Sequence, residues 1–377
     1  MTLRGLFEKT VFFLGAGASM DAGCLSSGGM LEELKEQIKE LPVSNPLKKP
    51  FQGIYDFIIA SLSYQNSMKI SGVQNGLTNI NIEDFVMVLR QLIDREYIIP
   101  PPLVGNWNNK IIGWEIQNGD VFIEFLRFVT ELLINEWTKF EEDKAEELIA
   151  PFRELIQSPD DFKLDIFTLN YDVVWEHCLN SDTERLIENG FSARRWTGVF
   201  DDENYPSKLL ISKLHGSVDW YFDSETEQVL LSEEPVSEPT IIFGSSNKMQ
   251  SFDPFISLLS RFRQRLQTST LYVIIGYSFQ DRYINNILIQ SLSSKLAGTA
   301  IVVDPSAWVS EQELVEKVEL TQRAKSLNEM INLTRINPER INLIKKNAKE
   351  FYKDYLTDGA EKLKNILEKV EEGEPTF

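Results

Sequence analysis

The chain has 377 residues, enough for two or three ordinary domains or for one large domain with an insertion. Its 38 lysines and arginines stand against 57 aspartates and glutamates, and the resulting net charge of −19 disfavours general coating of nucleic acid. Only two cysteines, Cys24 and Cys178, and two histidines, His177 and His215, are present. These counts exclude a disulfide framework, a cysteine-rich zinc module and a multi-histidine centre, so we expect no metal.

The sequence contains no run of the roughly 18 apolar residues that a membrane helix needs. Near the N-terminus, Arg4 and Lys9 precede the apolar run Val11–Leu14, which loosely imitates a signal peptide. That run is too short for a signal sequence, and glycines and Asp21 follow it at once. A buried strand leading into a glycine turn is the favoured interpretation, and we expect a cytoplasmic protein without membrane contact.

Six short, continuous apolar runs predict buried strands, and continuous runs are typical of parallel strands covered on both faces. Helical patterns at Asp253–Gln267 and Asp281–Lys295 lie between some of them. Alternating strands and helices predict an α/β fold, a Rossmann-like, doubly wound parallel sheet. The predicted strands are Val11–Leu14, Leu164–Leu169, Leu209–Leu214, Thr240–Phe243, Leu271–Ile275 and Ala300–Val303.

A long segment separates the first two predicted strands and shows helical periodicity at Glu83–Asp94 and Asp120–Trp137. We interpret it as a large helical insertion into the α/β domain. After Pro305 the chain is charged and helical in pattern, at Ser310–Ile331 and Pro338–Glu372, which predicts a helical C-terminal segment. The predicted boundaries place the α/β domain at 1–39 and 158–306, the insertion at 40–157 and the C-terminal segment at 307–377.

Small or polar residues follow every predicted strand, and in open α/β sheets ligands bind at that carboxyl edge. The first of these turns reads GAGAS, over residues 15–19, and its two glycines allow a diphosphate to approach the backbone. The dinucleotide fingerprint G-x-G-x-x-G is not completed, because Met20 stands where the third glycine belongs. A tight strand-to-helix turn without a ligand is the alternative.

Two later turns carry chemically active side chains. Asn170 and Asp172, in the motif TLNYD, place a carboxamide and a carboxylate two residues apart, although a turn or helix cap is the plain alternative. His215 lies in the motif KLHGS, and histidine is a residue type that commonly serves as a general base. His177 lies in a predicted helix, and we interpret it as structural.

Three more strand ends follow the same pattern. Gly244 and Ser245 come after one predicted strand, the motif GYSFQD at 276–281 after the next, and Asp304 with Pro305 after the last. One such turn is commonplace. Six together favour a nucleotide site at the carboxyl edge of the sheet.

The ordered motifs GAGAS, TLNYD, LHGS, GYSFQD and VDP resemble sirtuin-type NAD-binding domains, over residues 10–35 and 160–306. They are more similar to the NAD hydrolases of bacterial anti-phage defence than to protein deacylases. The resemblance implies that Asn170 and His215 are the catalytic pair and that Asp172 supports the ribose. It further implies that the dinucleotide contacts Gly15, Ala16, Gly17, Ala18, Ser19, Gly276 and Ser278. From their positions at strand ends, Gly244, Ser245, Tyr277, Asp281 and Asp304 are also predicted to bind it.

Two departures from the deacylases affect the expected substrate. The chain lacks their four-cysteine zinc module, and Cys24–Gly29 stands where they carry an Ile-Pro-Asp-Phe-Arg run. Both departures disfavour an acyl-lysine substrate, and the defence-type proteins share them. The resemblance therefore implies hydrolysis of NAD to nicotinamide and ADP-ribose, with NAD depletion in abortive infection. An NAD-dependent deacylase or ADP-ribosyl transferase, and a non-catalytic sensor of NAD or ADP-ribose, are the alternatives.

An unrestrained NAD hydrolase would drain its host, so a means of control is expected. The insertion's apolar helices bury their faces either within their own domain or against a neighbour. We predict a homo-oligomer, with plain internal packing as the alternative. The resemblance implies a HerA-type ATPase or a phage protein as activator. The charge of −19 indicates that any nucleic acid would be contacted by such a partner and not by this chain.

Overall fold

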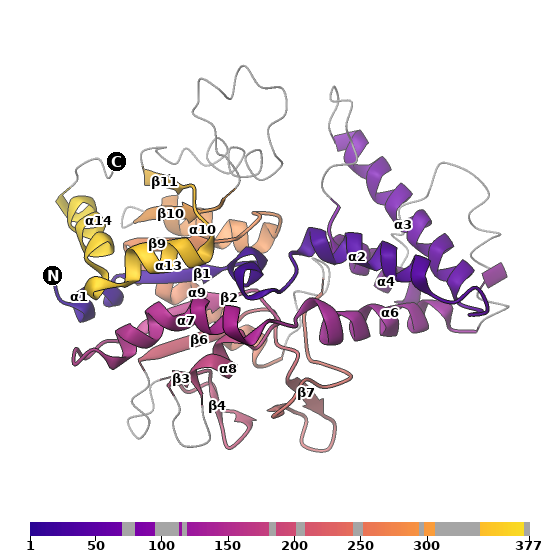
Figure 1. Ribbon diagram of the computed structural model, residues 1–377, viewed down its shortest axis with the longest axis horizontal. Coiled ribbons are helices and arrows are strands. Elements are labelled where there is room, and N and C mark those ends of the chain that lie inside the picture. Colours follow the sequence, from indigo (N-terminus) through magenta and orange to yellow (C-terminus); the bar gives the residue numbers. More distant parts are fainter. Residues whose placement is uncertain are drawn as a thin grey trace. The chain divides into compact units, whose positions relative to one another are not determined.

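The computed structural model describes residues 1–69, 80–94, 113–114, 119–180, 186–200, 208–243, 252–293, 298–305 and 340–372. The chain divides into two compact units, each described here by itself (Figure 1). The sheet unit comprises Met1–Cys24, Lys139–Ile241 and Gln250–Phe377, and the helical unit comprises Leu25–Thr138 and Ile242–Met249.

The sheet unit is built on seven parallel strands in the order β11-β10-β9-β1-β2-β6-β3. The chain leaves β1 toward β2 and β6, and it leaves β9 toward β10 on the opposite side, so the winding reverses between β1 and β9. This arrangement confirms the predicted Rossmann-like, doubly wound sheet, and the reversal marks the place where such sheets bind ligands. The strands are β1 (Thr10–Leu14), β2 (Leu164–Thr168), β3 (Ile187–Glu188), β6 (Leu209–Lys213), β9 (Leu271–Ile275), β10 (Thr299–Val303) and β11 (Ile341–Ile344).

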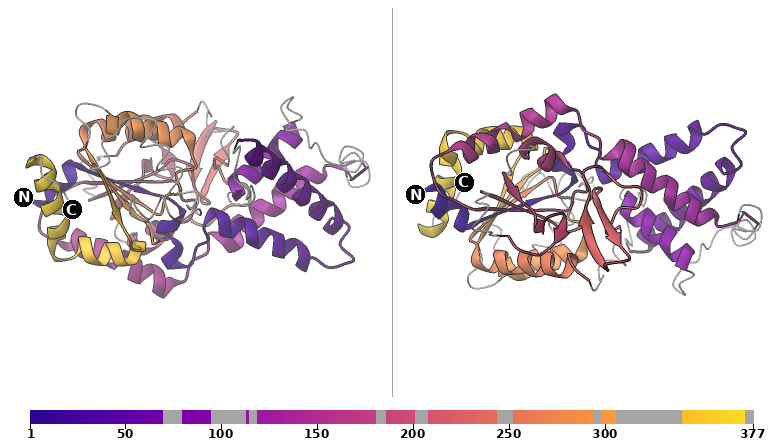
Figure 2. Two further views of the ribbon diagram at one scale, coloured as in Figure 1. Left: turned by 90° about the horizontal axis from the view of Figure 1, so that it is seen from above. Right: turned by 90° about the horizontal axis from the view of Figure 1, so that it is seen from below.

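Both faces of the sheet are apolar, as the continuous strand sequences predict. In β1, Phe12 and Leu14 belong to one core, and Val11 and Phe13 belong to the other. Orange helices cover one face in Figure 2, and the yellow helix α13 lies on the other. The first core contains α1 (Leu3–Glu8), α7 (Glu142–Gln157), α8 (Val174–Leu179), α13 (Ala348–Leu356) and α14 (Glu361–Glu372), and the second contains α9 (Phe255–Thr268) and α10 (Arg282–Ser293).

A smaller antiparallel sheet extends the second core, with the strand order β4-β5-β8-β7. The rings of Phe191, Trp196 and Trp220 contact one another there, with centroids 5.0 to 6.5 Å apart. These aromatic contacts stabilise strands that are too short to be stable by themselves. The strands are β4 (Phe191–Ser192), β5 (Arg195–Trp196), β7 (Trp220–Asp223) and β8 (Gln228–Leu231).

The helical unit has its own aromatic core. Phe51 stacks on Phe125 at 4.4 Å between ring centroids, and Phe85 meets Phe125 edge to face at 5.7 Å. The two helices expected at Glu83–Asp94 and Asp120–Trp137 are both present, because their apolar residues recur at helical spacing. The described elements are α2 (Ser27–Glu40), α3 (Lys48–Lys69), α4 (Ile82–Asp94), α6 (Val121–Leu132) and a π-helical turn at Leu133–Trp137.

Two strand assignments differ from the sequence-based expectation. The predicted strand Thr240–Phe243 is wrong: Ile241 forms only an isolated antiparallel bridge to Gly216. The segment 338–372 is predicted as helical, but its residues Ile341–Ile344 form the strand β11, which pairs in parallel with β10. Its four residues alternate in burial, as an edge strand does. The predicted helix Ser310–Ile331 lies outside the described residues.

Helix α7, which the sequence analysis assigned to the insertion, packs against α8 and α13 in the sheet unit. Its Phe152 meets the rings of Trp175 and Tyr352 edge to face, at 4.6 and 4.8 Å. The helix therefore covers the sheet, although its sequence continues directly from the predicted insertion.

Candidate functional site

Backbone hydrogen bonds hold the turns after five strands side by side. In each case the residue that follows a strand donates its N–H to the carbonyl at the end of the neighbouring strand. The predicted turns therefore share one edge of the sheet. The bonds are Leu169 to Leu14 (3.0 Å), Gly15 to Ile275 (2.9 Å), Leu214 to Thr168 (2.8 Å), Gly276 to Val303 (3.1 Å) and Asp304 to Ile344 (3.1 Å).

The glycines of the turns after β1 and β9 pack backbone against backbone. A Cβ on Gly15 would lie 2.7 Å from the Gly276 carbonyl oxygen, and one on Gly17 would lie 2.7 Å from the Gly276 Cα. Gly276 has φ +62°, and a Cβ there would lie 2.4 Å from the Ala18 nitrogen. Glycine is thus required at all three positions for the two turns to meet between β1 and β9.

Three backbone N–H groups of the first turn are already used within the protein. Gly15 donates to Ile275, Gly17 donates to Gly276, and Ala18 donates to Gly15. A ligand at this turn would therefore benefit from its shape and small side chains more than from these three donors. The turn continues as two short 3₁₀ helices, Ala16–Ala18 and Met20–Ala22.

Ser19 and Asn170 come from different turns and meet at the sheet edge. The Asn170 Nδ2 donates to the Ser19 Oγ at 2.9 Å, and the Asn170 backbone N–H donates to the Thr168 Oγ1 at 3.0 Å. Asn170 is only 8% exposed, and no described residue donates to its Oδ1. A buried acceptor without a donor costs about 1–3 kcal/mol, so this oxygen marks a place where a ligand could bind.

Asp172 is a second hydrogen-bond partner of the Ser19 side chain. Its Oδ1 accepts from the Val174 backbone N–H at 3.3 Å, and it also accepts a hydrogen bond from the Ser19 side chain. Burial raises the pKa of Asp172, although Lys213 and Ser19 partly oppose that shift. The Ser19 hydroxyl therefore joins the predicted carboxamide to the predicted carboxylate.

His215 and Asp281 form a buried pair from two different strand ends. The His215 Nε2 lies 3.3 Å from the Asp281 Oδ2, and each side chain is only 4% exposed. The Asp281 Oδ1 accepts from the backbone N–H groups of Tyr283 and Ile284, at 2.9 and 3.2 Å, in the first turn of α10. The Tyr171 ring lies nearly parallel to the imidazole, with 6.4 Å between centroids.

Lys213, which sequence reasoning did not select, ties the Asn170 loop to the His215 loop. Its Nζ donates to the Asp172 carbonyl at 2.5 Å and to the Ser217 Oγ at 2.7 Å, and it lies 3.1 Å from the Glu176 Oε1. The Ser217 hydroxyl in turn donates to the Tyr171 carbonyl at 3.3 Å. The signal for this residue was present, because Lys213 is the only charge in the apolar run Leu209–Leu214.

The lysine is almost completely buried, with 2% of its surface exposed. Burial by itself lowers the pKa of Lys213, but Glu176, Asp219 and Asp172 outweigh it and raise that pKa. Burial likewise raises the pKa of Glu176, against the attraction of Lys213. The charged lysine is therefore held in place by carboxylates that surround it.

The remaining predicted residues have varied surroundings. Tyr277 is structural in part, since its hydroxyl donates to the Asn285 Oδ1 at 2.8 Å and its ring packs edge to face on Phe13. Ser278 is half-buried in the turn after β9, and Asp304 is buried in the turn after β10. Gly244 and Ser245 lie outside the described residues.

His177 has different surroundings from His215. It lies on α8 with its side chain 47% exposed, and its Nε2 is 3.8 Å from the Glu142 Oε1. Its ring packs at 5.1 Å from that of Phe140. These surroundings agree with the structural role expected for it.

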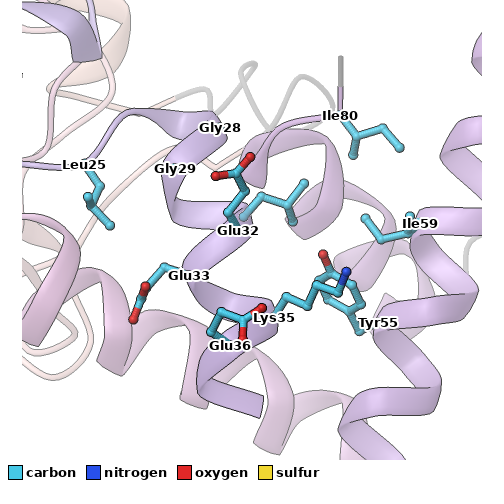
Figure 3. A pocket seen from close by; sticks show the side chains of 11 residues that line it. Leu25, Gly28, Gly29, Glu32, Glu33, Lys35, Glu36, Tyr55, Ile59 and Ile80 are labelled. Carbon is cyan, nitrogen blue, oxygen red and sulfur yellow. The ribbon is translucent and has the colours of Figure 1, made fainter. Parts of the chain in front are cut away.

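The helical unit contains a hollow of about 880 Å³ between α2 and α3 (Figure 3). Its wall is apolar and acidic, and the buried Tyr55 forms part of it. Burial, together with the charges of Asp56, Glu32 and Glu36, raises the pKa of Tyr55 to about 12. None of the predicted site residues lines it. The lining residues are Leu25, Gly28, Gly29, Leu31, Glu32, Glu33, Lys35, Glu36, Tyr55, Ile59 and Ile80.

Within the described ranges, three or more His, Cys, Asp or Glu side chains are nowhere grouped so as to hold a metal ion. Among the described helices, none has both the length and the apolar character needed to cross a membrane.

A comparison with protein-family models gives one match. Residues 165–328 match the SIR2-like domain. The matched stretch begins in β2 and includes Asn170, Asp172, His215 and Asp281, whereas the glycine turn at 15–19 precedes it. The match supports the sirtuin-like resemblance for this part of the chain. No curated protein sequence matches the chain.

Solved Sir2 structures align with most of the chain at low identity. A Sir2 homologue bound to NAD is 12% identical, with a TM-score of 0.43 over 96% of this chain and 93% of that one. A Sir2 homologue variant bound to ADP-ribose is 11% identical, with a TM-score of 0.41 over 96% and 95%. A Sir2 complex with a p53 peptide and NAD⁺ is 13% identical, with a TM-score of 0.38 over 94% and 96%. The fold assignment stands on the strand order of the chain itself.

Proposed function

We propose that this chain hydrolyses the nicotinamide–ribose bond of NAD and releases nicotinamide and ADP-ribose. The proposal places the reaction at the carboxyl edge of the sheet, where Asn170, His215 and Asp172 come together with the glycine turns. The SIR2-like match over 165–328 supports NAD as the ligand.

The Asn170 carboxamide is the observation that carries the proposal. Its Nδ2 is fixed by Ser19, while its buried Oδ1 has no donor among the described residues. A ribose hydroxyl or an attacking water would supply that missing donor. Because the carboxamide is already oriented by Ser19, binding would cost little further ordering of this side chain.

The chemistry needs no metal and no acid for the leaving group. Nicotinamide departs as a neutral molecule from a cationic pyridinium, so the site must only position water, stabilise an oxocarbenium-like transition state and accept one proton. His215 is suited to accept that proton, and a positioned general base contributes about 10²–10⁴-fold. Asp172 supports the ribose side indirectly, by accepting from the Ser19 hydroxyl that holds Asn170.

The biological role that we propose follows from the resemblance to defence-type proteins. NAD depletion would stop an infected cell from supporting a phage, and the protein would act in the cytoplasm as a homo-oligomer. A HerA-type ATPase or a phage protein would switch it on. Light scattering of the purified chain tests the assembly, and a strictly monomeric protein that is fully active without any partner would contradict this role.

The activity itself is tested by incubating the purified chain with an equimolar amount of NAD, alone and with candidate activators, and measuring the nicotinamide and ADP-ribose released. We expect release by the wild type and loss of release in Asn170→Ala. The matched control is Asn45→Ala, because the Asn45 Oδ1 only accepts from the Leu47 N–H in an exposed turn of the helical unit.

Three outcomes would overturn the proposal. Release that requires an acylated peptide would make the chain a deacylase. Binding of NAD without release under any of these conditions would make it a sensor. Equal release by the wild type and Asn170→Ala would place the chemistry elsewhere.

A further inference from the structure

We propose that Asp281 is a positioning residue that fixes the tautomer of His215, so that the imidazole accepts the proton through Nδ1. The inference rests on the proposed hydrolysis of NAD and deepens it. Sequence reasoning assigned Asp281 only to dinucleotide binding.

The Asp281 carboxylate is held at both oxygens. Oδ1 accepts two backbone N–H groups, from Tyr283 and Ile284, and Oδ2 lies 3.3 Å from the His215 Nε2. The start of α10, a helix of 12 residues, also stabilises a negative charge at this position. The carboxylate is therefore fixed in place before any substrate arrives.

Neighbouring groups also restrict the imidazole. His215 lies two residues after the end of β6, and Gly216 after it has φ +81° and would place a Cβ only 2.1 Å from the Thr240 carbonyl oxygen. The Tyr171 ring lies alongside the imidazole plane. Three separate elements thus fix the ring, which leaves little freedom for Nε2 to leave Asp281.

A neutral imidazole has one N–H donor and one acceptor nitrogen. Because a carboxylate only accepts, the proton of His215 is assigned to Nε2, and the lone pair is left on Nδ1. In the reaction, the water oxygen bonds to the ribose C1′ while the C–N bond electrons pass to nicotinamide. The water proton goes to Nδ1, and the carboxylate of Asp281 stabilises the resulting imidazolium until that proton returns to solvent.

The competing explanation is that Asp281 only caps α10. Asparagine distinguishes the two roles, because it caps a helix as well as aspartate does but carries no charge. Its amide can also donate to Nε2, which would favour the wrong tautomer. Asp281→Asn is therefore expected to keep the fold while reducing the catalytic step.

The kinetic test compares Asp281→Asn with Asp253→Asn. Asp253 stands at the start of α9, where its Oδ1 accepts from the Ser257 N–H and hydroxyl, and it is paired with neither histidine. We expect kcat of Asp281→Asn to fall by a factor on the order of 10²–10⁴ with KM little changed, and Asp253→Asn to remain near wild type. A kcat of Asp281→Asn within a few-fold of wild type would overturn the proposal.

A second test does not depend on activity, so its failure is distinguishable from failure of the proposed function. The chain has only two histidines, and ¹⁵N-histidine labelling therefore gives two imidazole spin systems, which a His177→Gln variant assigns. We expect the His215 nitrogen shifts to report a fixed Nε2–H tautomer in the wild type and a changed tautomer in Asp281→Asn. A protonated Nδ1, or averaging of the kind expected of the exposed His177, would overturn the proposal.

Discussion

The two histidines of the chain lie in regions that use similar residue types in opposite ways. At the sheet edge, His215 has a carboxylate partner, Asp281, and an aromatic neighbour, and both partners are almost fully buried. On the surface of α8, His177 also has a carboxylate, Glu142, and an aromatic neighbour, but its side chain is 47% exposed. The two histidines have the same kinds of neighbours, and they differ in how far their side chains are exposed to solvent.

That difference has energetic consequences. Water screens an exposed ion pair and leaves its members free to rotate, so such a pair contributes about 0–1 kcal/mol. A buried pair must be held by further hydrogen bonds, and for the His215–Asp281 pair the backbone N–H groups of Tyr283 and Ile284 at the start of α10 supply them by donating to Asp281. Buried polar groups held in this way give a site its fixed geometry.

The largest effect is expected at Lys213. In Lys213→Met, Asp172, Glu176 and Asp219 would remain buried without their shared cation, and we expect a loss of about 3–5 kcal/mol in the free energy of unfolding. The matched control on the surface is Lys144→Met, which removes an exposed pair with Glu141 and should cost about 0.5 kcal/mol or less. Urea unfolding of both variants measures the difference.

The same variant has a predicted pH dependence. Burial already raises the pKa of Asp172 and of Glu176, and loss of the attraction to Lys213 would raise both further. A carboxyl whose pKa is higher in the folded than in the unfolded state destabilises the fold as pH rises through those values. The deficit of Lys213→Met relative to wild type should therefore shrink in acid. A deficit that grows in acid would contradict the arrangement.

A buried and an exposed glycine are expected to differ in the same way. Gly276→Ala would place a Cβ 2.4 Å from the Ala18 nitrogen at a φ of +62°, so we expect a cost on the order of 1–3 kcal/mol. At Gly28, in the first turn of α2, no described atom lies within 4 Å of the added Cβ. Gly28→Ala should be neutral or stabilise by up to about 1 kcal/mol. Thermal unfolding of the two variants decides, and equal effects would contradict the packing of the turns.

The smallest expected effect is on the surface pair. Glu142→Gln removes the carboxylate 3.8 Å from His177, and because both side chains are exposed we expect a change of about 0.5 kcal/mol or less. Nicotinamide release should be unchanged. A large loss of either stability or activity would show that the α8 surface contributes more than its exposure suggests.

Much of the sheet could be predicted, because a buried parallel strand leaves a continuous apolar run such as Leu271–Ile275 in the sequence. The same rule failed at Thr240–Phe243, which is apolar because its residues are buried and not because it joins the sheet. It also missed β11, whose short alternating sequence, INLI, carries no such signal. Apolar character reports burial, and pairing depends on distant strands.

The candidate site residues were predicted in the same way, from their positions at strand ends. Their mutual contacts were not, because the His215–Asp281 pair joins residues that only the strand order of the sheet brings together. Lys213 was missed because a lysine in an apolar run cannot be assigned a role until the carboxylates that pair with it are located. The positions of residues in the sequence indicate which side chains can take part, and the strand order of the sheet determines which of them come into contact.

The most direct test of the account is nicotinamide release from NAD by His215→Ala and His177→Ala, measured beside the wild type at equal protein concentration. The account predicts that His215→Ala loses activity by about 10²–10⁴-fold or more while remaining folded, and that His177→Ala retains it. Near-normal release by His215→Ala, or an equal loss in both variants, would contradict the assignment of the sheet edge as the site of NAD hydrolysis.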